Sequence, residues 1–561
     1  MLYHSLTDFE FVLNICYGEN NGGEIWKSDE KCVFLHDNTV TGMKRFNTTG
    51  KCIADRHYMV PIDRQVEYAA QMVEDNLYFC INRGRQYGKT TTLDFLEKHL
   101  QEQGLVVFSI SFESLPDSSF ESLETLLAST IEMMGQPIKW IGIPNIKEQS
   151  LQLLNNIYEQ HQKSIEQPVF LELVNSLCAI NRCVLIIDEV DAAGNYPEFI
   201  KFLGLLRDMY LKRDKFPTFQ SVVLAGVYDI KNLKLNIRPE EQHQYNSPWN
   251  IAAPFDTDMS LHADGIAIML ADYASEHDIA FDCQTVAQMI YDYTSGYPFL
   301  VSRLCQIVDG KHLTWDKEGV LAAVNILLKE GNTLFDDLMK KLTQFPEMAA
   351  MLKAILFNGE RVPFNYYDKY INLAAMFNFV YENMGAVAVS CRIFETWLYN
   401  YFASEERTSG FYRKGEEFRT QFVHDGQLDM LRLIERFSVH FNETFRPGHD
   451  DRFVEREGRK LFLTYLRPVI NGIGNYYAEA ETRDLTRTDV IVDYLGQQYV
   501  VELKIWRGES YNERGERQLA EYLDYYHLKT GYLVSFCFNK NKQPGLREVR
   551  VGDRIVFEAI V

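Results

Sequence analysis

The sequence has little that would place it in a membrane or outside a cell. No run of residues approaches the roughly 18–20 consecutive apolar side chains that a membrane-spanning helix needs. The first residues, MLYHSLTDFEFVL, have neither the basic segment nor the apolar core of a secretory signal. The ten cysteines include no Cys-x-x-Cys pair, which argues against a zinc ribbon or a disulfide framework and favours reduced thiols. We therefore expect a cytoplasmic protein without a membrane partner.

Positive charge is also scarce, with 57 Lys and Arg against 78 Asp and Glu in 561 residues, a formal charge of −21. The deficit is uneven. Residues 447–561 contain 17 Lys and Arg and 18 Asp and Glu, so they are nearly neutral, and the remainder carries −20. Because a strongly acidic protein is a poor nonspecific binder of nucleic acid, only the C-terminal part suits such a partner. The sequence has no internal repeat and no low-complexity tract.

What the sequence does contain, from about residue 46 to 255, is an alternation of short apolar runs and helical stretches. Each apolar run is followed by a turn or a helix, which is typical of buried parallel strands in an α/β domain. Apolar spacings of three and four residues predict helices further on, and two short strands around an Asn-Met-Gly turn predict a winged-helix-like segment. The predicted strands are 77–82, 105–112, 183–188, 220–226, 375–381 and 386–390, and the helices include 266–273 and 286–293.

Residues 77–93 combine a strand, a loop and the start of a helix, and the loop ends in Gly88-Lys89-Thr90. Gly88 lets the backbone curl so that N–H groups point at phosphate oxygens. Lys89 would then reach the β- and γ-phosphates of ATP, and Thr90 would bind Mg²⁺. The usual pattern has its first glycine at position 83, where this chain has Arg83 and a glycine one residue later. Alone, the loop could be a glycine-rich turn at a helix start.

A second element strengthens the prediction of a nucleotide site. The apolar run 183–188 ends in Asp188, and Glu189 follows it. Asp188 at the strand tip can hold Mg²⁺ through water, and Glu189 can orient or activate the water that attacks the γ-phosphate. By themselves these acids could belong to a solvated loop. Together with the phosphate-binding loop they predict ATP hydrolysis.

The loop Arg83-Gly-Arg-Gln-Tyr-Gly-Lys-Thr90 resembles the arginine-rich loop of the bacterial AAA-like ATPases that carry a C-terminal nuclease domain. The resemblance implies that Arg85 and Thr91 also contact the nucleotide, and it extends from about residue 44 to the C-terminus. The other stretches that resemble this family are 46–50, 57–60, 224–233, 247–252 and 293–303.

The same resemblance implies residues that sense the γ-phosphate. Gly226 occupies the place where a polar sensor is expected, and Tyr228 and Asp229 are the nearest polar candidates. Arg303 could be a second sensor. Arg238 could be a finger that reaches the nucleotide of a neighbouring copy, which would require a homo-oligomer. For each arginine, a surface or structural salt bridge is the alternative.

A β-hairpin is predicted near the C-terminus, with a two-residue turn at 496–497. This register places Asp489 opposite Lys504 and Ile491 opposite Glu502. Opposed residues share a sheet face, as do residues two apart on one strand. The hairpin therefore brings two carboxylates and one lysine to one face.

This arrangement resembles the active site of PD-(D/E)XK nucleases. The resemblance implies that Asp489 and Glu502 bind Mg²⁺, which lowers the pKa of a bound water, and that Lys504 orients that water and stabilises charge at phosphorus. Gln518, on the following helix, resembles the accessory glutamine of some members, and Thr488 replaces the proline of the family's name. The alternative is an exposed hairpin with incidental charges.

Such nucleases usually contribute another acid from the helix that precedes the hairpin, here predicted over 453–469. Glu455 and Glu457 lie on opposite flanks of its apolar stripe, so geometry leaves both open, and resemblance favours Glu455 as a further Mg²⁺ ligand. Glu479 and Glu481, on the strand before the hairpin, are further candidates that could equally be structural or solvent-facing.

The predicted fold class is α/β: a P-loop parallel-sheet ATPase with a helical lid and a winged-helix-like segment, followed by an α/β restriction-endonuclease-like domain. The predicted function is an ATP-regulated, Mg²⁺-dependent nuclease acting on nucleic acid, DNA in preference to RNA. A role against mobile DNA follows only from the type of architecture. The alternatives are an ATP-dependent switch or a repair motor whose C-terminal domain only binds nucleic acid or a partner.

The predicted boundaries are 1–45 for an N-terminal extension, 46–258 for the ATPase core, 259–345 for the lid, 346–410 for the winged-helix-like segment, 411–446 for a helical connector and 447–561 for the nuclease-like domain.

Overall fold

The computed structural model of the chain describes twelve stretches of the sequence. The predicted N-terminal extension lies almost wholly outside them. Within the described stretches, every helix is too short or too polar to cross a lipid bilayer. The described residues are 43–139, 141–160, 163–227, 249–358, 360–405, 410–424, 427–444, 455–470, 474–481, 487–506, 509–538 and 545–561.

The first part of the chain forms a four-stranded parallel sheet of order β1-β4-β3-β2. All four predicted strands are confirmed, each within two residues of its predicted ends. The strands are β1 (Phe79–Asn82), β2 (Val106–Ser111), β3 (Cys183–Asp188) and β4 (Ser221–Gly226). The helices are α2 (Asp63–Glu74), α3 (Lys89–Glu102), α4 (Leu123–Gly135), α5 (Glu148–Gln160), α6 (Gln167–Ile180) and α7 (Pro197–Leu211), with short 3₁₀ turns η1 (Phe112–Ser114), η2 (Asp117–Phe120), η3 (Gln136–Lys139) and η4 (Val190–Ala193).

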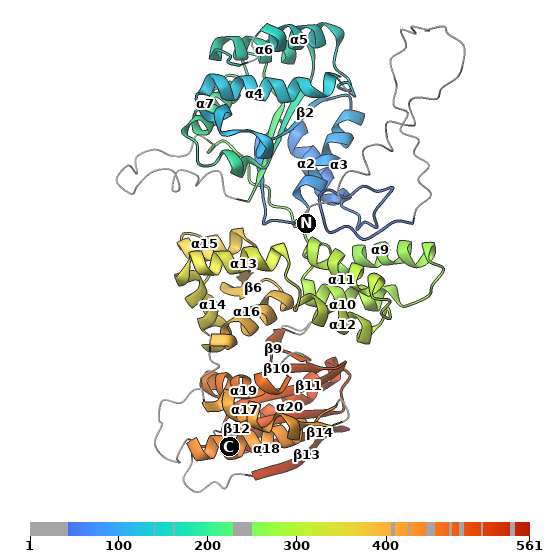
Figure 1. Cartoon of the computed structure of the whole chain (residues 1–561), viewed down its shortest axis with the longest axis vertical. Helices are drawn as coiled ribbons and strands as arrows, with labels where there is room; N and C mark the ends of the chain where they lie inside the picture. Colours follow the sequence, from blue (N-terminus) through green and yellow to red (C-terminus); the bar gives the residue numbers. More distant parts are fainter. Residues whose placement is uncertain are drawn as a thin grey trace, which may run out of the picture. The chain divides into compact units, whose positions relative to one another are not determined.

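Helices cover both faces of this sheet, which explains why its strands are almost continuously apolar. Ile186 and its same-face neighbours pack against α2 and α3, whereas Ile187 and its neighbours pack against α4 to α7. Figure 1 shows the two sets of helices on either side of the strands. All six side chains of β3 are buried, and this central strand ends at the acidic residue Asp188.

A helical region follows the sheet. The helices predicted around 266–273 and 286–293 are confirmed. The small hairpin is confirmed in part: Ala375 belongs to a helix rather than a strand, and the turn at Met384 and Gly385 has positive φ at both residues. The elements are α9 (Ala263–Glu276), α10 (Cys283–Thr294), α11 (Pro298–Gly310), α12 (Lys317–Leu327), α13 (Thr333–Gln344), α14 (Pro346–Asn358), α15 (Lys369–Met376), β5 (Val380–Asn383), β6 (Ala386–Val389) and α16 (Arg392–Glu405).

The last part of the chain contains a six-stranded mixed sheet of order β13-β14-β12-β11-β10-β9. In chain order it has a helix, three antiparallel strands, a helix and then a strand parallel to the third. The elements are α17 (Gly410–Phe422), β7 (Val423–His424), β8 (Gln427–Leu428), α18 (Met430–Thr444), α19 (Glu455–Ile470), β9 (Gly474–Glu481), β10 (Arg487–Tyr494), β11 (Gln497–Ile505), α20 (Glu509–Tyr525), β12 (Thr530–Phe536), β13 (Gly545–Val551) and β14 (Arg554–Ile560).

Helices cover both faces of the C-terminal sheet as well. Gly531 of β12 is in close contact with α20, and Phe536 at the end of the same strand packs its ring against Phe441 of α18, with centroids 5.1 Å apart. Phe437 of α18 packs against Phe462 of α19, with centroids 5.2 Å apart. Phe422 at the end of α17 packs its ring near Tyr465 of α19, with centroids 6.3 Å apart, so the segment expected to be a connector contributes two helices to the core of this part.

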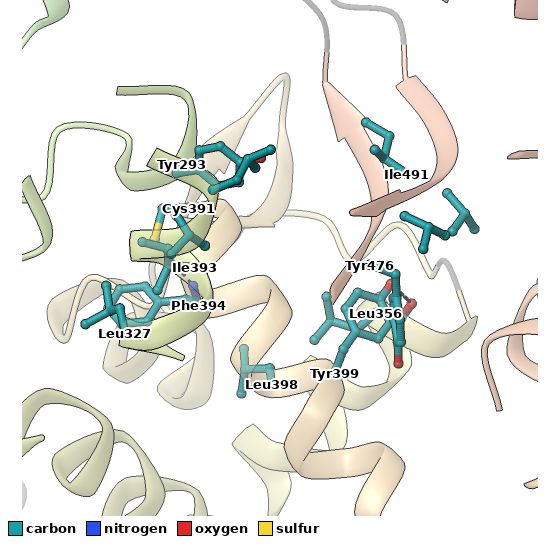
Figure 2. Close-up of a cluster of buried hydrophobic side chains, with 14 of the residues drawn as sticks. Tyr293, Leu327, Leu356, Cys391, Ile393, Phe394, Leu398, Tyr399, Tyr476 and Ile491 are labelled. Carbon is teal, nitrogen blue, oxygen red and sulfur yellow. Dashed lines mark hydrogen bonds between the residues drawn. The ribbon is translucent and has the colours of Figure 1, made fainter. Parts of the chain in front are cut away.

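The helical region and the C-terminal sheet also share buried contacts. Tyr399 of α16 packs its ring against Tyr476 of β9, and its hydroxyl donates to the Leu356 carbonyl of α14 at 2.5 Å. Figure 2 shows Tyr399, Tyr476 and Leu356 together, with Tyr293 and Ile491 nearby. Burying Leu356 here contributes about 1.5–3 kcal/mol, and the two buried tyrosine rings add to it.

Candidate functional site

The parallel register brings polar residues to one edge of the first sheet. Asn82 lies beside Gly226, and Ser111 lies beside Asp188, so the carboxyl ends of the four strands are neighbours. The chain leaves β1 through the loop 83–88 and enters α3 at Lys89. A helix start directly after a buried strand points its free N–H groups at the same edge, which favours an anion there.

The loop has the geometry that its sequence predicted around Gly88 and Lys89. Gly88 adopts φ +81°, a left-handed conformation that favours glycine. The side chain of Lys89 is buried, and its Nζ donates to the carbonyl oxygens of Arg83 and Gly84, both at 3.0 Å. Burial lowers the pKa of the Lys89 ammonium, and the nearby carboxylates of Glu189 and Asp188 oppose that shift. The loop therefore encloses a cation at the place where phosphates would lie.

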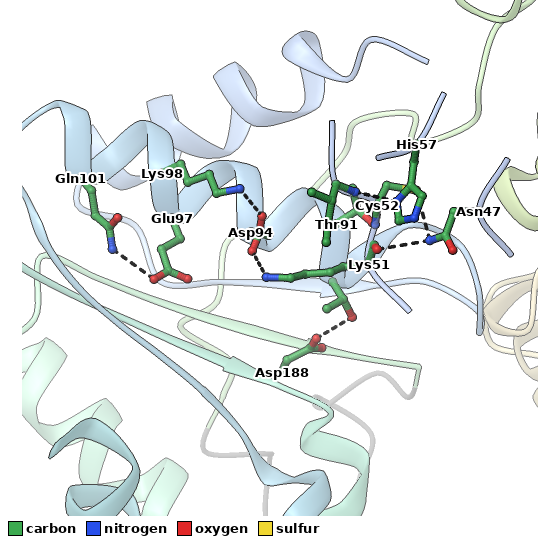
Figure 3. Close-up of polar contacts among 12 residues, drawn as sticks. Asn47, Lys51, Cys52, His57, Thr91, Asp94, Glu97, Lys98, Gln101 and Asp188 are labelled. Atoms are coloured by element: carbon green, nitrogen blue, oxygen red, sulfur yellow. Dashed lines mark hydrogen bonds and ion pairs between the residues drawn. The ribbon is translucent and has the colours of Figure 1, made fainter. Parts of the chain in front are cut away.

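Thr90 and Asp188 are brought together as predicted. The Thr90 hydroxyl donates to Oδ2 of Asp188 at 2.7 Å, and Asp188 is labelled in Figure 3. An alcohol and a carboxylate oxygen are hard donors that suit Mg²⁺, which takes its remaining oxygens from water and nucleotide phosphates. These two residues would hold the ion, which would neutralise charge on the phosphates.

Glu189 is held in an unusual backbone conformation next to this pair. Its φ of 51° lies in the left-handed region, and its N–H donates to Oδ1 of Asp188 at 2.8 Å. Burial raises the pKa of the Glu189 carboxyl; Lys89 opposes the shift, and the neighbouring acids Asp188 and Asp191 add to it. A carboxyl with a raised pKa beside a bound phosphate is suited to accept a proton from water.

The structure explains why the glycine stands at 84 and not at 83. Neither residue has a positive φ, so the loop needs no glycine for its backbone conformation there. A Cβ at Gly84 would lie 2.8 Å from Nδ2 of Asn378 and 3.0 Å from the carbonyl oxygen of Phe377, so any larger residue would require Asn378 and the turn to shift. Phe377 and Asn378 follow α15, so the winged-helix-like segment lies directly against the loop.

Side chains of neighbouring residues, chiefly Asp191, occupy the space at the expected sensor position. A Cβ at Gly226 would lie 2.9 Å from Oδ1 of Asp191, and Oδ2 of Asp191 accepts from the N–H of Val227 at 2.5 Å. Asp191 therefore fills the space that a sensor side chain would need. The candidates Tyr228, Asp229 and Arg238 lie outside the described residues. Arg303 forms a bidentate ion pair with Glu330, at 2.6 and 3.0 Å. This contact favours a structural salt bridge, the alternative to a sensor role for Arg303.

The helical region contributes contacts to the loop that the sequence did not predict. The Tyr297 hydroxyl donates to the Arg85 carbonyl oxygen at 2.5 Å, and the Tyr297 and Tyr87 rings meet edge to face. Gln86 donates to the Thr333 hydroxyl at 3.0 Å. The Arg85 side chain is exposed. A signal for Tyr297 existed in the Ser-Gly-Tyr-Pro stretch, since glycine and proline fix the turn that presents it.

The segment before α2 covers the other side of the helix start. The Thr91 hydroxyl accepts from the N–H of Cys52 at 3.1 Å, and Lys51 forms an ion pair with Asp94. Figure 3 shows these residues along α3. Thr91 thus holds the preceding segment against the loop, and the predicted contact of Thr91 with a nucleotide stays a prediction.

The register of the C-terminal hairpin corrects the prediction. Its two-residue turn is Leu495-Gly496, both with positive φ, and not 496–497. Ile491 therefore pairs with Val500 rather than Glu502, because a turn with two left-handed residues matches the strand twist and needs its glycine second. In this register position 489 opposes 502 rather than 504. Because the parity of paired positions is unchanged, 489, 502 and 504 still fall on one face of the hairpin.

Of the predicted nuclease residues, Glu502 and Lys504 are brought together in the described structure. Glu502 is 0% exposed, and its Oε1 lies 2.8 Å from Nζ of Lys504. Gln518 of α20 donates to the Tyr522 hydroxyl at 2.5 Å. The backbone of Asp489 belongs to β10. The side chains of Asp489, Glu455, Glu457, Glu479 and Glu481 lie outside the described residues.

A second buried polar group in the same sheet was not predicted from the sequence. Glu558 of β14 is fully buried, accepts from the Ser535 hydroxyl at 3.1 Å and forms an ion pair with Arg547. Arg547 also reaches Glu516 of α20 at 3.2 Å. Glu502 and Glu558 lie in one row across the sheet, separated by Leu533 of β12. Among the described residues, no three acidic, cysteine or histidine side chains gather closely enough to hold a metal by themselves.

Comparison with known proteins identifies the family. No curated protein matches the chain. Solved structures with a similar fold include the Walker-type ATPase of Pyrococcus abyssi, at 13% identity and TM-score 0.44 over 63% of this chain and 99% of that one. Cdc6p of Pyrobaculum aerophilum has 13% identity and TM-score 0.29 over 62% and 96%, and the Orc1 protein of Aeropyrum pernix, solved with DNA, has 12% and 0.28 over 61% and 94%.

The family model described as an AAA-like domain matches residues 54–401, which is more than half of the chain. This range includes the phosphate-binding loop, the acidic end of β3 and the helical region that contacts the loop. The chain therefore belongs to the AAA-like domain family and is an ATPase.

Proposed function

We propose that this ATPase is an ATP-regulated, Mg²⁺-dependent nuclease that hydrolyses phosphodiester bonds in DNA. The observation that carries the proposal is the pair Glu502 and Lys504 on β11, one strand of a hairpin whose other strand contains position 489. The order of helix, three antiparallel strands, helix and parallel strand around this pair supports it. We further propose the predicted domain boundaries, with α17 and α18 packed into the C-terminal part.

The chemistry follows from what these side chains can hold. Asp489 and Glu502 would bind Mg²⁺, which would acidify a water and shield the scissile phosphate. Lys504 now pairs with the Glu502 carboxylate at 2.8 Å, so it would move toward the phosphate when a cation takes its place. Gly515 of α20 lies beside the Lys504 stem, where an added Cβ would make an ordinary contact of 3.6 Å with the lysine Cγ. A lysine near an anionic phosphate stabilises negative charge that develops in the transition state.

Contacts between the ATPase and the hairpin support regulation. The Tyr293 hydroxyl, at the end of α10, donates to Oδ2 of Asp493 at 2.9 Å, and both groups are buried. Asp493 is on β10, four residues after Asp489. The ammonium of Lys317, on α12, lies close enough for the Asp493 carboxylate to oppose the lowering of its pKa by burial. Figure 2 shows Tyr293 and Ile491 in one buried cluster.

The residue that ends the connection from α10 into α11 contacts the phosphate-binding loop, close in sequence to the residue of α10 that contacts β10. Tyr297, four residues after Tyr293, donates to the Arg85 carbonyl. A nucleotide that rearranges the loop can therefore act on α10 and on the hairpin through adjacent contacts. Coupling between the two sites is measured as a change in cleavage rate with the bound nucleotide.

The decisive experiment incubates the purified full chain with plasmid, linear and single-stranded DNA, and with RNA, each with and without Mg²⁺ and ATP. We expect Mg²⁺-dependent cleavage that Asp489→Ala or Lys504→Ala abolishes. Lys529→Ala is the matched control, because Lys529 is an exposed lysine of the same sheet region. Undiminished cleavage by both site variants would contradict the assignment of the site.

The alternatives give different results in the same experiment. Retention of DNA without cleavage would favour an ATP-dependent switch whose C-terminal part only binds nucleic acid or a partner. Rapid ATP turnover stimulated by DNA, again without cleavage, would favour a repair motor. Cleavage of RNA alone would keep the nuclease and change its substrate.

A further inference from the structure

A cavity of about 540 Å³, its open mouth included, lies directly beside the phosphate-binding loop. Gly88 and Thr91 form the wall nearest the loop, and apolar side chains such as Val60, Met259 and Pro298 form much of the rest. A nucleotide whose phosphates lie on the loop would therefore place its nucleoside in this cavity.

One polar side chain in this largely apolar lining, Gln65, is well placed to bind a ligand. The residue is on the first turn of α2, lines the cavity and is only 8% exposed. Within the described part of the chain, its carboxamide makes no hydrogen bond. A carboxamide that lines a cavity and makes no hydrogen bond to the described residues is available to a group that supplies both a donor and an acceptor.

A carboxamide matches the edge of adenine. Adenine presents its amino group as a donor next to a ring nitrogen that accepts, and one glutamine can pair with both at once. Guanine carries a further amino donor at C2 that a single carboxamide cannot also satisfy, and in an apolar site that donor would lose its hydrogen bonds to water. We infer that Gln65 binds the base edge and selects adenine over guanine nucleotides. This inference rests on nucleotide binding at the loop.

The test measures the affinity of the full chain for ATP, GTP and tripolyphosphate by calorimetry. We expect the wild type to prefer ATP over GTP by at least about tenfold, as for a site that pairs with one base and leaves the other unsatisfied. Gln65→Leu should weaken ATP binding about tenfold, because two hydrogen bonds are lost, and should leave tripolyphosphate binding unchanged. Gln71→Leu, at an exposed glutamine of the same helix, is the matched control and should bind as the wild type does.

Gln65→Glu keeps the size of the side chain and changes only its hydrogen-bonding character, so it tests the inference without a change in packing. A carboxylate only accepts, which suits the two neighbouring N–H donors of guanine and opposes the ring nitrogen of adenine. The preference for ATP over GTP should therefore fall at least tenfold in this variant.

Two results would overturn the inference, and they differ in what else they affect. If both Gln65 variants keep the wild-type ratio of ATP to GTP affinity, Gln65 does not select the base, although the loop still binds nucleotide. If the wild type binds neither ATP nor tripolyphosphate, nucleotide binding at the loop fails and the inference fails with it.

Discussion

Replacing Gly84 by alanine is a direct test of the contact between the winged-helix-like segment and the phosphate-binding loop. The added methyl carbon would lie 2.8 Å from Nδ2 of Asn378 and 3.0 Å from the Phe377 carbonyl oxygen. The amide can rotate away, but the backbone oxygen can retreat only if the turn moves. Overpacking of this kind costs about 1–3 kcal/mol. We expect Gly84→Ala to destabilise the folded chain by about that amount and to weaken ATP binding.

The assay compares thermal unfolding and ATP affinity of this variant with those of Gly135→Ala. Gly135 lies at the end of α4, has ordinary φ and has open space where a Cβ would be, so its replacement should cost nothing. Adding Asn378→Ala to Gly84→Ala should recover part of the loss, because it removes the closer of the two contacts. If Gly84→Ala unfolds and binds ATP as the wild type does, the argument that glycine is required at 84 is refuted.

Three further predictions concern the two sites and their coupling. Lys89→Ala should weaken ATP binding about tenfold or more, whereas Glu189→Gln should bind ATP and fail to hydrolyse it; equal ATP affinity in wild type and Lys89→Ala would count against the loop assignment. Because burial raises the pKa of Glu189, this carboxyl should become protonated at a pH above the ordinary range of a glutamate. ATP turnover should fall as the pH is lowered through that range, because a protonated carboxyl cannot act as a base. An ATP turnover that does not fall there would contradict the role of Glu189 as the base. Tyr293→Phe should destabilise the chain by about 1–3 kcal/mol, since it removes a hydrogen bond to the Asp493 carboxylate, and should reduce the difference in DNA cleavage between ADP and ATP; an unchanged difference would show that this contact carries no coupling.

The order of local elements could be read from the sequence because it depends on local patterning. Short apolar runs such as 183–188 are strands, since side chains buried on both faces must be apolar throughout. The sequence could predict that Lys89, Thr90 and Asp188 lie together, because a helix start after a buried strand and an acid at the end of a neighbouring strand are fixed by connectivity and register. The hairpin turn was misplaced by one residue, because glycine satisfies either position of a two-residue turn.

Only the tertiary structure decided what touches the loop from far away in the sequence. Tyr297, Thr333 and Phe377 reach it from three different elements, and no periodicity in the sequence records such contacts. That packing also explains three local features. Glycine is favoured at 84, Asp191 fills the space at the expected sensor position, and Gln65 lines the cavity beside the loop. A residue's type limits the chemistry it can perform, and its neighbours in space determine which part of that chemistry it performs.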